Sequence, residues 1–222
     1  MIKYTKYLTI LIIFFVFFSL LKNEATPAAH YLSFAITVNP NGQIDRSGKG
    51  LYFVLLNNNP GELINATDNR TFTDFICFNG VNTTWYHRRT DPVNLTFFIW
   101  EQAGIINTNC YVSPDNKQLT VTFNTLDQTV FLNQYITQNN FTAHVVTTDD
   151  KSRFKFDTLG QGPDLVNNSI NTLRVNKLIG IMPPTPSFYP ADPVDDVAKS
   201  DKLPKDFPYE NFDIIKFEVI VN

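Results

Sequence analysis

Short apolar segments with a two-residue period recur along most of this chain, and they limit the folds that it can form. In residues 32–38 every second side chain is large and apolar, and a turn sequence rich in Asn, Pro and Gly follows at 39–42. A two-residue period places one set of side chains on one face, as in a half-buried β-strand. Helical periodicity is nearly absent, so we expect the chain to form sheets.

Strand and turn signals together predict an antiparallel β-sandwich. The clearest hairpin joins 109–113 to 119–123 through Pro114-Asp-Asn-Lys117, in which Pro presets the turn. Residues 51–56 form a continuous apolar run, as in a strand covered on both faces, and 129–136 is the one modest helix candidate. Further strands are predicted at 72–78, 84–88, 95–100, 141–146, 153–156 and 215–221. About eight to ten short strands favour an all-β sandwich over its alternative, a barrel.

Residues 1–29 have the pattern of a secretory signal peptide. Two lysines precede an apolar run at 7–21, and a small-residue patch follows at 25–29. The run of about fifteen apolar residues is shorter than the roughly 20 that cross a bilayer comfortably. We therefore expect a cleaved signal helix and a secreted or extracytoplasmic protein. The alternative is an uncleaved N-terminal anchor, which would be the protein's only contact with a membrane.

The remaining residues, 30–222, are expected to form a single β-sandwich domain of usual size. Within it, 182–208 is rich in Pro and Asp and has no period. Such a segment is typical of a long surface strap rather than a core. Because a regular alternating strand follows at 215–221, the strap is predicted to be an excursion from this domain and not a linker to a second one.

Two cysteines, Cys77 and Cys110, leave two interpretations open. In an oxidising compartment they can form a disulfide that closes a loop of about 33 residues and stabilises the fold by about 3–4 kcal/mol. Alternatively, they are two separate, buried free thiols, as is common for Cys in apolar strands. The sequence does not supply the Cα separation that decides between them.

Charge and motifs exclude several classes of function. The net charge is −3 and the charged residues are scattered, so no basic stripe is present for nucleic acid. No sequence motif for a nucleophilic hydrolase or a phosphate-binding loop occurs, which favours a protein that is not an enzyme. A glycoside hydrolase whose carboxylates are brought together only by folding stays open. The carboxylate pairs Asp149-Asp150 and Asp195-Asp196 leave a calcium site open, and no metal is assigned.

The order of segments resembles secreted β-sandwiches of the DOMON and family 9 carbohydrate-binding-module type. The resemblance covers roughly residues 31 to 160, and it rests on 51–60, 74–80, Trp85-Tyr86, 113–123 and 157–160. It implies a noncatalytic fold that binds sugars on an aromatic platform, or haem in some members. Haem needs an axial Met and His pair, and Met182 lies in the strap away from any ligand pattern, so no cofactor is expected.

For sugar binding, the residues that match the resemblance are Trp85, Tyr86 and Trp100, whose faces would stack against pyranose rings. The alternative is that these aromatic side chains lie in the sandwich core. His87 follows Tyr86 and is the most site-like of the three histidines, although a solvated strand edge explains it as well.

We therefore expect a secreted or surface-tethered noncatalytic domain that binds carbohydrate or another cell-surface component. The main alternative is a structural or envelope interaction protein without a small ligand, whose strap docks a partner. The carboxylate-dependent hydrolase is the third possibility.

Overall fold

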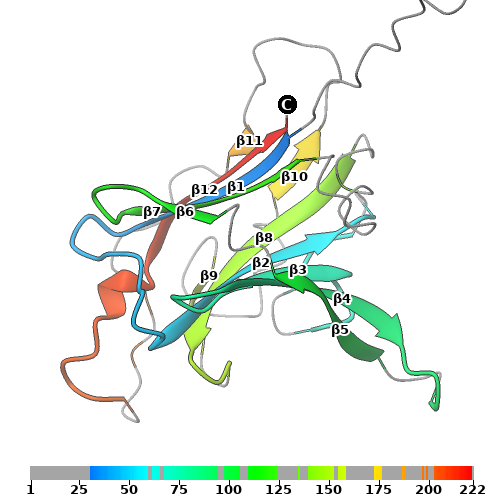
Figure 1. The fold of residues 1–222 in the computed structure, drawn as a ribbon, viewed down its shortest axis with the longest axis horizontal. Helices are drawn as coiled ribbons and strands as arrows, with labels where there is room; N and C mark the ends of the chain where they lie inside the picture. Colours follow the sequence, from blue (N-terminus) through cyan, green and yellow to red (C-terminus); the bar gives the residue numbers. More distant parts are fainter. Residues whose placement is uncertain are drawn as a thin grey trace, which may run out of the picture.

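The chain folds, in a computed structural model, into two antiparallel β-sheets that form two layers (Figure 1). The structure describes residues 31–59, 62–65, 68–94, 98–105, 110–124, 135, 140–152, 155–158, 173–176, 187–188, 197, 199 and 203–221. This arrangement confirms the predicted all-β class and is consistent with a sandwich. The predicted signal helix at 1–29 and most of the strap at 182–208 lie outside the described residues.

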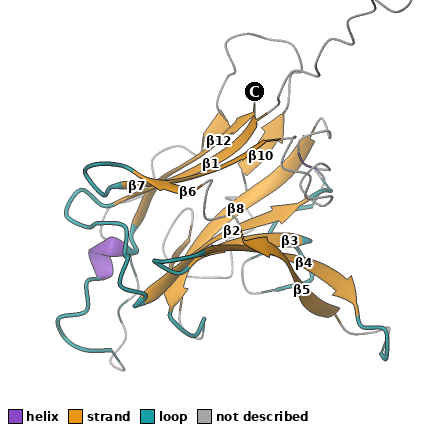
Figure 2. Cartoon of the chain, in the orientation of Figure 1, coloured by secondary structure: helices purple, strands orange, loops and turns teal. Residues whose placement is uncertain are grey.

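The first sheet, sheet A, has the strand order β11-β12-β1-β7-β6. Its strands are β11 (Ser187–Phe188), β12 (Ile214–Val221), β1 (Tyr31–Val38), β7 (Gln118–Asn124) and β6 (Cys110–Val112). The first described strand thus pairs with the last, and Figure 1 shows the blue and red arrows side by side. A short 3-10 helix, η4 (Tyr209–Asn211), precedes β12 and is the helix drawn in Figure 2.

The second sheet, sheet B, has the order β10-β8-β2-β3-β4-β5, and β9 pairs with another part of β8. Its strands are β10 (Leu173–Asn176), β8 (Asn140–Asp149), β2 (Gly50–Asn57), β3 (Asp74–Phe78), β4 (Thr83–Thr90), β5 (Phe98–Ile105) and β9 (Lys155–Thr158). Most of the predicted strands are present within a few residues of their expected bounds. The short strands β10 and β11 were not predicted.

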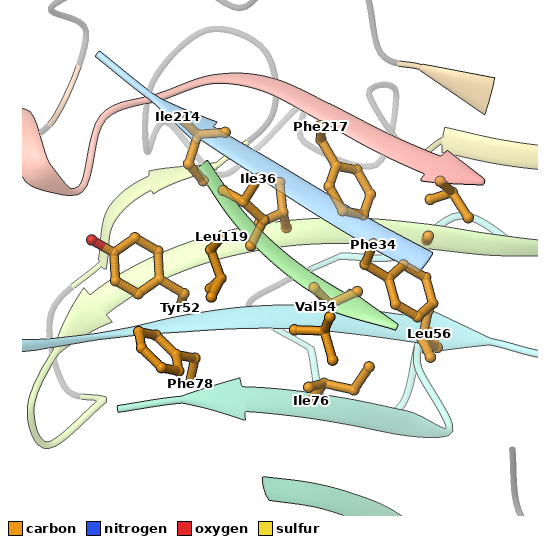
Figure 3. Packing of buried hydrophobic residues seen from close by; sticks show 14 of the residues in the cluster. Phe34, Ile36, Tyr52, Val54, Leu56, Ile76, Phe78, Leu119, Ile214 and Phe217 are labelled. Atoms are coloured by element: carbon orange, nitrogen blue, oxygen red, sulfur yellow. The ribbon is translucent and has the colours of Figure 1, made fainter. Parts of the chain in front are cut away.

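The core lies between the two sheets and follows from the alternation in sequence (Figure 3). In β1, Phe34 and Ile36 are at most 2% exposed, and the Phe34 ring stacks on Phe217 of β12 with centroids 6.5 Å apart. Sheet B contributes Val54 and Leu56 from the facing side. Each such side chain stabilises the fold by about 1.5–3 kcal/mol through burial.

The predicted strand at 51–56 needs a correction, and most of the predicted helix at 129–136 lies outside the described residues. Strand β2 is buried on both faces only over 54–57, because Leu51 and Phe53 are half-buried on its outer side. Of the predicted helix at 129–136, the structure describes Tyr135 alone, which is fully buried. No helix in the described part of the chain is both long and apolar enough to span a bilayer.

Candidate functional site

Trp85 belongs to the core and not to a surface platform. It is 1% exposed, and its ring packs edge-on against Phe123 of β7, with centroids 5.9 Å apart. Its Nε1 donates a hydrogen bond of 3.2 Å to Oδ1 of Asp74. Successive side chains of a strand point to opposite faces, so Trp85 points toward sheet A while its neighbour Tyr86 points away from it. This corrects the expectation that Trp85 stacks on a ligand.

Tyr86 and Trp100 do come together, on the side of sheet B that faces away from sheet A. They form an outer aromatic patch with three phenylalanines, so the patch consists of Phe53, Phe72, Phe75, Tyr86 and Trp100. The Phe75 ring is central: its centroid lies 4.6 Å from that of Tyr86 and 4.9 Å from that of Trp100. All of the rings except Phe72 are half-buried, so part of each remains accessible.

Strand register explains how residues from five segments meet in the outer aromatic patch. Phe75 of β3 lies directly opposite Tyr86 of β4, and an irregularity after Trp85 places Gln102 of β5 opposite Tyr86. Trp100, two residues earlier in β5, then reaches Phe75 and stacks on Phe72 with centroids 5.2 Å apart.

A small buried cluster supports the outer aromatic patch from the neighbouring strands. Leu55 of β2 and Val146 of β8 are each 3% exposed, and Ile64, from the segment before β3, is fully buried. Phe53, Phe75 and Trp100 pack against this cluster. Rings held by packing on a sheet lose little freedom on binding, so the patch is preorganised.

Polar groups lie beside the outer aromatic patch on β4 and β5. The Arg88 guanidinium carbon sits 4.5 Å from the centroid of Phe98, and Nη1 donates a 2.6 Å hydrogen bond to the carbonyl oxygen of Arg70. Gln102, opposite Tyr86, is exposed. The arrangement therefore combines ring faces with an amide and a guanidinium, which suits a ligand that has both apolar and hydroxyl surfaces.

His87 does not join the outer aromatic patch. Its Nδ1 lies 2.7 Å from Oδ1 of Asp74, and the His87 side chain is 21% exposed. Asp74 is fully buried and also accepts hydrogen bonds from Trp85 and from the Tyr135 hydroxyl. These four residues, Asp74, Trp85, His87 and Tyr135, form what we call the Asp74 cluster.

The Asp74 cluster resembles a general-base arrangement only in its His–carboxylate hydrogen bond. The Thr73 hydroxyl lies beside the cluster and forms a 2.7 Å hydrogen bond with the Tyr135 hydroxyl. The carboxylate is surrounded by donors from β4 and from Tyr135, so it ties these segments to β3. A structural role for His87 therefore accounts for its contacts.

Cys77 and Cys110 are both free thiols. Cys77 alternates with the inward residues Ile76 and Phe78 of β3 and so lies on the outer side of sheet B, whereas Cys110 lies in sheet A and packs partly against the core. Burial raises the pKa of the Cys77 thiol to about 12 and also raises the pKa of Cys110. The structure thus favours the second of the two interpretations, two separate thiols, and both are protonated at neutral pH.

A cleft of about 340 Å³ opens between the β3–β4 turn and β6. Its lining includes Arg46, Val81, Cys110 and Tyr111. Val81 and Tyr111 are 73% and 59% exposed, so this cleft is open to solvent and is bordered by exposed side chains rather than by packed rings. It is less well suited to hold a ligand than the outer aromatic patch.

Metal-ligand residues do not converge within the described part of the chain. No group of three or more His, Cys, Asp or Glu side chains there is arranged to hold a metal ion. Of the carboxylate pairs considered for calcium, Asp149 is buried and Asp150 is exposed at the end of β8, and Asp195-Asp196 lie outside the described residues.

Comparisons with protein-family models, with curated proteins and with solved structures found no match for this chain. The geometry of the sites is therefore the basis for a functional proposal.

Sequence reasoning identified Tyr86 and Trp100 but missed Phe53, Phe72 and Phe75. The signal for Phe75 was present, because it alternates with the inward residues Asp74 and Ile76 and so must point outward. In a half-buried strand the outward-facing positions are usually polar. Large apolar residues at those positions therefore indicate a second apolar surface on the outer side of the sheet. Phe53 shows the same pattern in β2.

Proposed function

We propose that this protein is a noncatalytic binding domain, secreted or tethered at a cell surface, that binds carbohydrate on the outer aromatic patch. The observation that carries the proposal is the contact between the half-buried rings of Phe75, Tyr86 and Trp100 on one face of a sheet. These three rings come from three neighbouring strands, lie outside the core between the two sheets, and each leaves part of its surface accessible.

Carbohydrate suits this surface for physical reasons. A pyranose ring has an apolar face of C–H groups that packs on aromatic rings, and a rim of hydroxyls that needs hydrogen-bond partners. The Gln102 amide beside Tyr86 and the Arg88 guanidinium beside Phe98 supply such partners. The patch is a surface rather than an enclosed pocket, which favours an extended chain of sugars over a single small molecule.

Two expectations from sequence agree with this proposal. Residues 31 to 160 resemble the DOMON and family 9 carbohydrate-binding-module type, in which sugars are bound on aromatic platforms. The predicted signal peptide would deliver the domain to a compartment where glycans are exposed.

The proposal is tested by screening the full chain on a glycan array, followed by titration of each glycan that binds. Removing a stacking ring in Trp100→Ala or Tyr86→Ala is expected to weaken binding by about 1–2 kcal/mol, which is about tenfold. Tyr111→Ala is the matched control, because Tyr111 is 59% exposed on β6 of the other sheet. No binding to any glycan, or equal binding by all three variants, would contradict the proposal.

A second candidate is an interaction protein without a small ligand. Strand β5 is last in the order of sheet B, and Phe98 and Ile99 on it are 40% and 41% exposed. An edge strand with exposed apolar side chains is a place where an extended segment of another protein can add to the sheet. This candidate predicts that Ile99→Lys abolishes partner binding, whereas Trp100→Ala does so only if the partner also covers the patch.

A further inference from the structure

Strand register places Arg88 on the same face of sheet B as the outer aromatic patch. Arg88 lies directly opposite Trp100 of β5, and residues opposite each other in antiparallel strands project their side chains from the same face. Its guanidinium carbon is 4.5 Å from the centroid of Phe98, which precedes Trp100 by two residues and therefore shares that face. The outer aromatic patch thus has a cation at its border.

The backbone of the segment before β3 holds one end of the Arg88 side chain. Nη1 donates hydrogen bonds of 2.6 Å to the carbonyl oxygen of Arg70 and of 3.4 Å to that of Asn69. Neither Nε nor Nη2 is hydrogen-bonded to a residue that the structure describes. A guanidinium has five N–H donors, and one on Nε and one on Nη2 point side by side, as two oxygens of an oxyanion require. Arg88 therefore presents a preformed edge with two donors.

Arg70 shows how such an edge is used when a carboxylate is close. Its Nε and Nη2 donate to Oδ1 and Oδ2 of Asp68 at 2.8 and 2.7 Å. Arg89 is also paired, with Glu101 at 2.8 Å. Arg88 forms no ion pair with any described residue, so its charge is not compensated in the same way. The border of the outer aromatic patch is therefore suited to a ligand that carries a negative charge.

We propose that the outer aromatic patch binds acidic carbohydrate, with a carboxylate or sulfate of the sugar on Nε and Nη2 of Arg88. The proposal rests on the carbohydrate function proposed above and names its substrate class. A sugar ring stacked on Trp100 brings its substituents next to Arg88, because the two residues are opposite each other in β5 and β4. Hydrogen bonds to a charged acceptor are about twice as strong as neutral ones, so Arg88 selects an anionic substituent over a hydroxyl.

The test titrates the full chain by isothermal titration calorimetry with matched polysaccharides: polygalacturonate and its methyl ester, and dextran sulfate and dextran. The acidic member of at least one pair is expected to bind about tenfold more tightly than the neutral member. The pair that shows the preference distinguishes a carboxylate from a sulfate ligand. Arg88→Met should reduce the preference to about twofold or less. Arg88→Lys should keep only part of it, because lysine retains the charge but not the two-donor edge.

Lys151→Met is the matched control for the attraction of a polyanion to the whole protein. It changes the net charge by the same amount as Arg88→Met, but it removes an exposed lysine in the turn after β8. This variant should keep the preference of the wild type. A structural role of Arg88 alone, in which it ties Arg70 and Phe98 to β4, would change stability and leave the preference for acidic glycans unaltered.

A measurement on the wild type covers the case in which Arg88→Met does not fold. Raising the NaCl concentration from about 0.05 to about 0.5 M should reduce the preference and leave the affinity for the neutral polysaccharides nearly constant, because salt screens the charge of Arg88. A preference that does not change with salt would contradict the proposal.

Three other results would each overturn the assignment of acidic carbohydrate: no binding of either acidic polysaccharide, equal binding of the acidic and neutral members, or a preference that survives Arg88→Met. If neutral glycans bind in any of these cases, the carbohydrate function stands without its acidic substrate class. If no glycan binds in calorimetry or on the array, both proposals fail.

Discussion

The buried His144 is expected to make the protein less stable in mild acid. The pKa of His144 is lowered from 6.5 to about 3 in the folded protein, mainly by burial and also by the charge of Lys155. Between these two values the unfolded chain takes up a proton on His144 and the folded chain does not. The free energy of unfolding therefore falls as the pH drops below 6.5, and it continues to fall until about pH 3.

The size of the effect follows from the two pKa values. The full difference corresponds to about 5 kcal/mol at 1.36 kcal/mol per pKa unit. At pH 5 the unfolded state is already mostly protonated at this site, and the folded state is about 2 kcal/mol less stable than at pH 7. Small domains have about 5–15 kcal/mol of stability in total, so this loss is easily measured.

The variant that isolates this effect is His144→Gln. The Gln amide can replace Nε2 in the hydrogen bond to Thr158, but it does not titrate. Urea unfolding at pH 7 and pH 5, followed by Trp fluorescence, should show a loss for the wild type that is about 2 kcal/mol greater than for His144→Gln. The matched control is His87→Asn, which keeps His144 and should keep the full loss.

Equal losses in wild type and His144→Gln would refute this reasoning, because they would assign the acid sensitivity to other groups. If the decrease in the free energy of unfolding between pH 7 and pH 5 disappears in His87→Asn, the acid sensitivity originates in the Asp74 cluster and not at His144.

Three further predictions concern the interior and the thiols. Asp74→Ala leaves the donors of the Asp74 cluster without their buried acceptor and is expected to destabilise the protein by about 3 kcal/mol or more in urea unfolding. Leu56→Ala should cost about 2–5 kcal/mol because Leu56 is fully buried in the core, whereas Val81→Ala, at 73% exposure, should change the unfolding midpoint little. Cys77 and Cys110 should both react slowly with a thiol reagent at pH 8 and rapidly after unfolding, since the pKa of each thiol is raised; fast labelling of the folded protein would contradict this.

The strands could be predicted because alternation is a local property of the sequence. The hairpin of β6 and β7 is an example: its turn residues identify it, and Asn116 at the turn has the positive φ of 57° that Asn tolerates. The short strands β10 and β11 could not be found in this way, since two to four residues are too few to show a period.

The candidate site was predicted only in part because it depends on pairing between strands. Because successive residues of a strand point to opposite faces, Trp85 and Tyr86 cannot both belong to one aromatic platform. Which face Trp100 occupies depends on the irregular register between β4 and β5, which no local pattern reveals. The same limit applies to Cys77 and Cys110, whose separation is set by how the two sheets pack.

The pairing of β1 with both β12 and β7 has a consequence for the order of folding. Strand β1 is central in sheet A, yet one of its two neighbours is the last described strand. Contacts between residues so distant in sequence form slowly, because a long loop must close before they contribute. During synthesis, the hairpin partners β2, β3 and β4 can pair as they emerge, but one edge of β1 stays open until residues 214–221 are available. A chain shortened before β12 would therefore leave one edge of β1 exposed and be prone to aggregation.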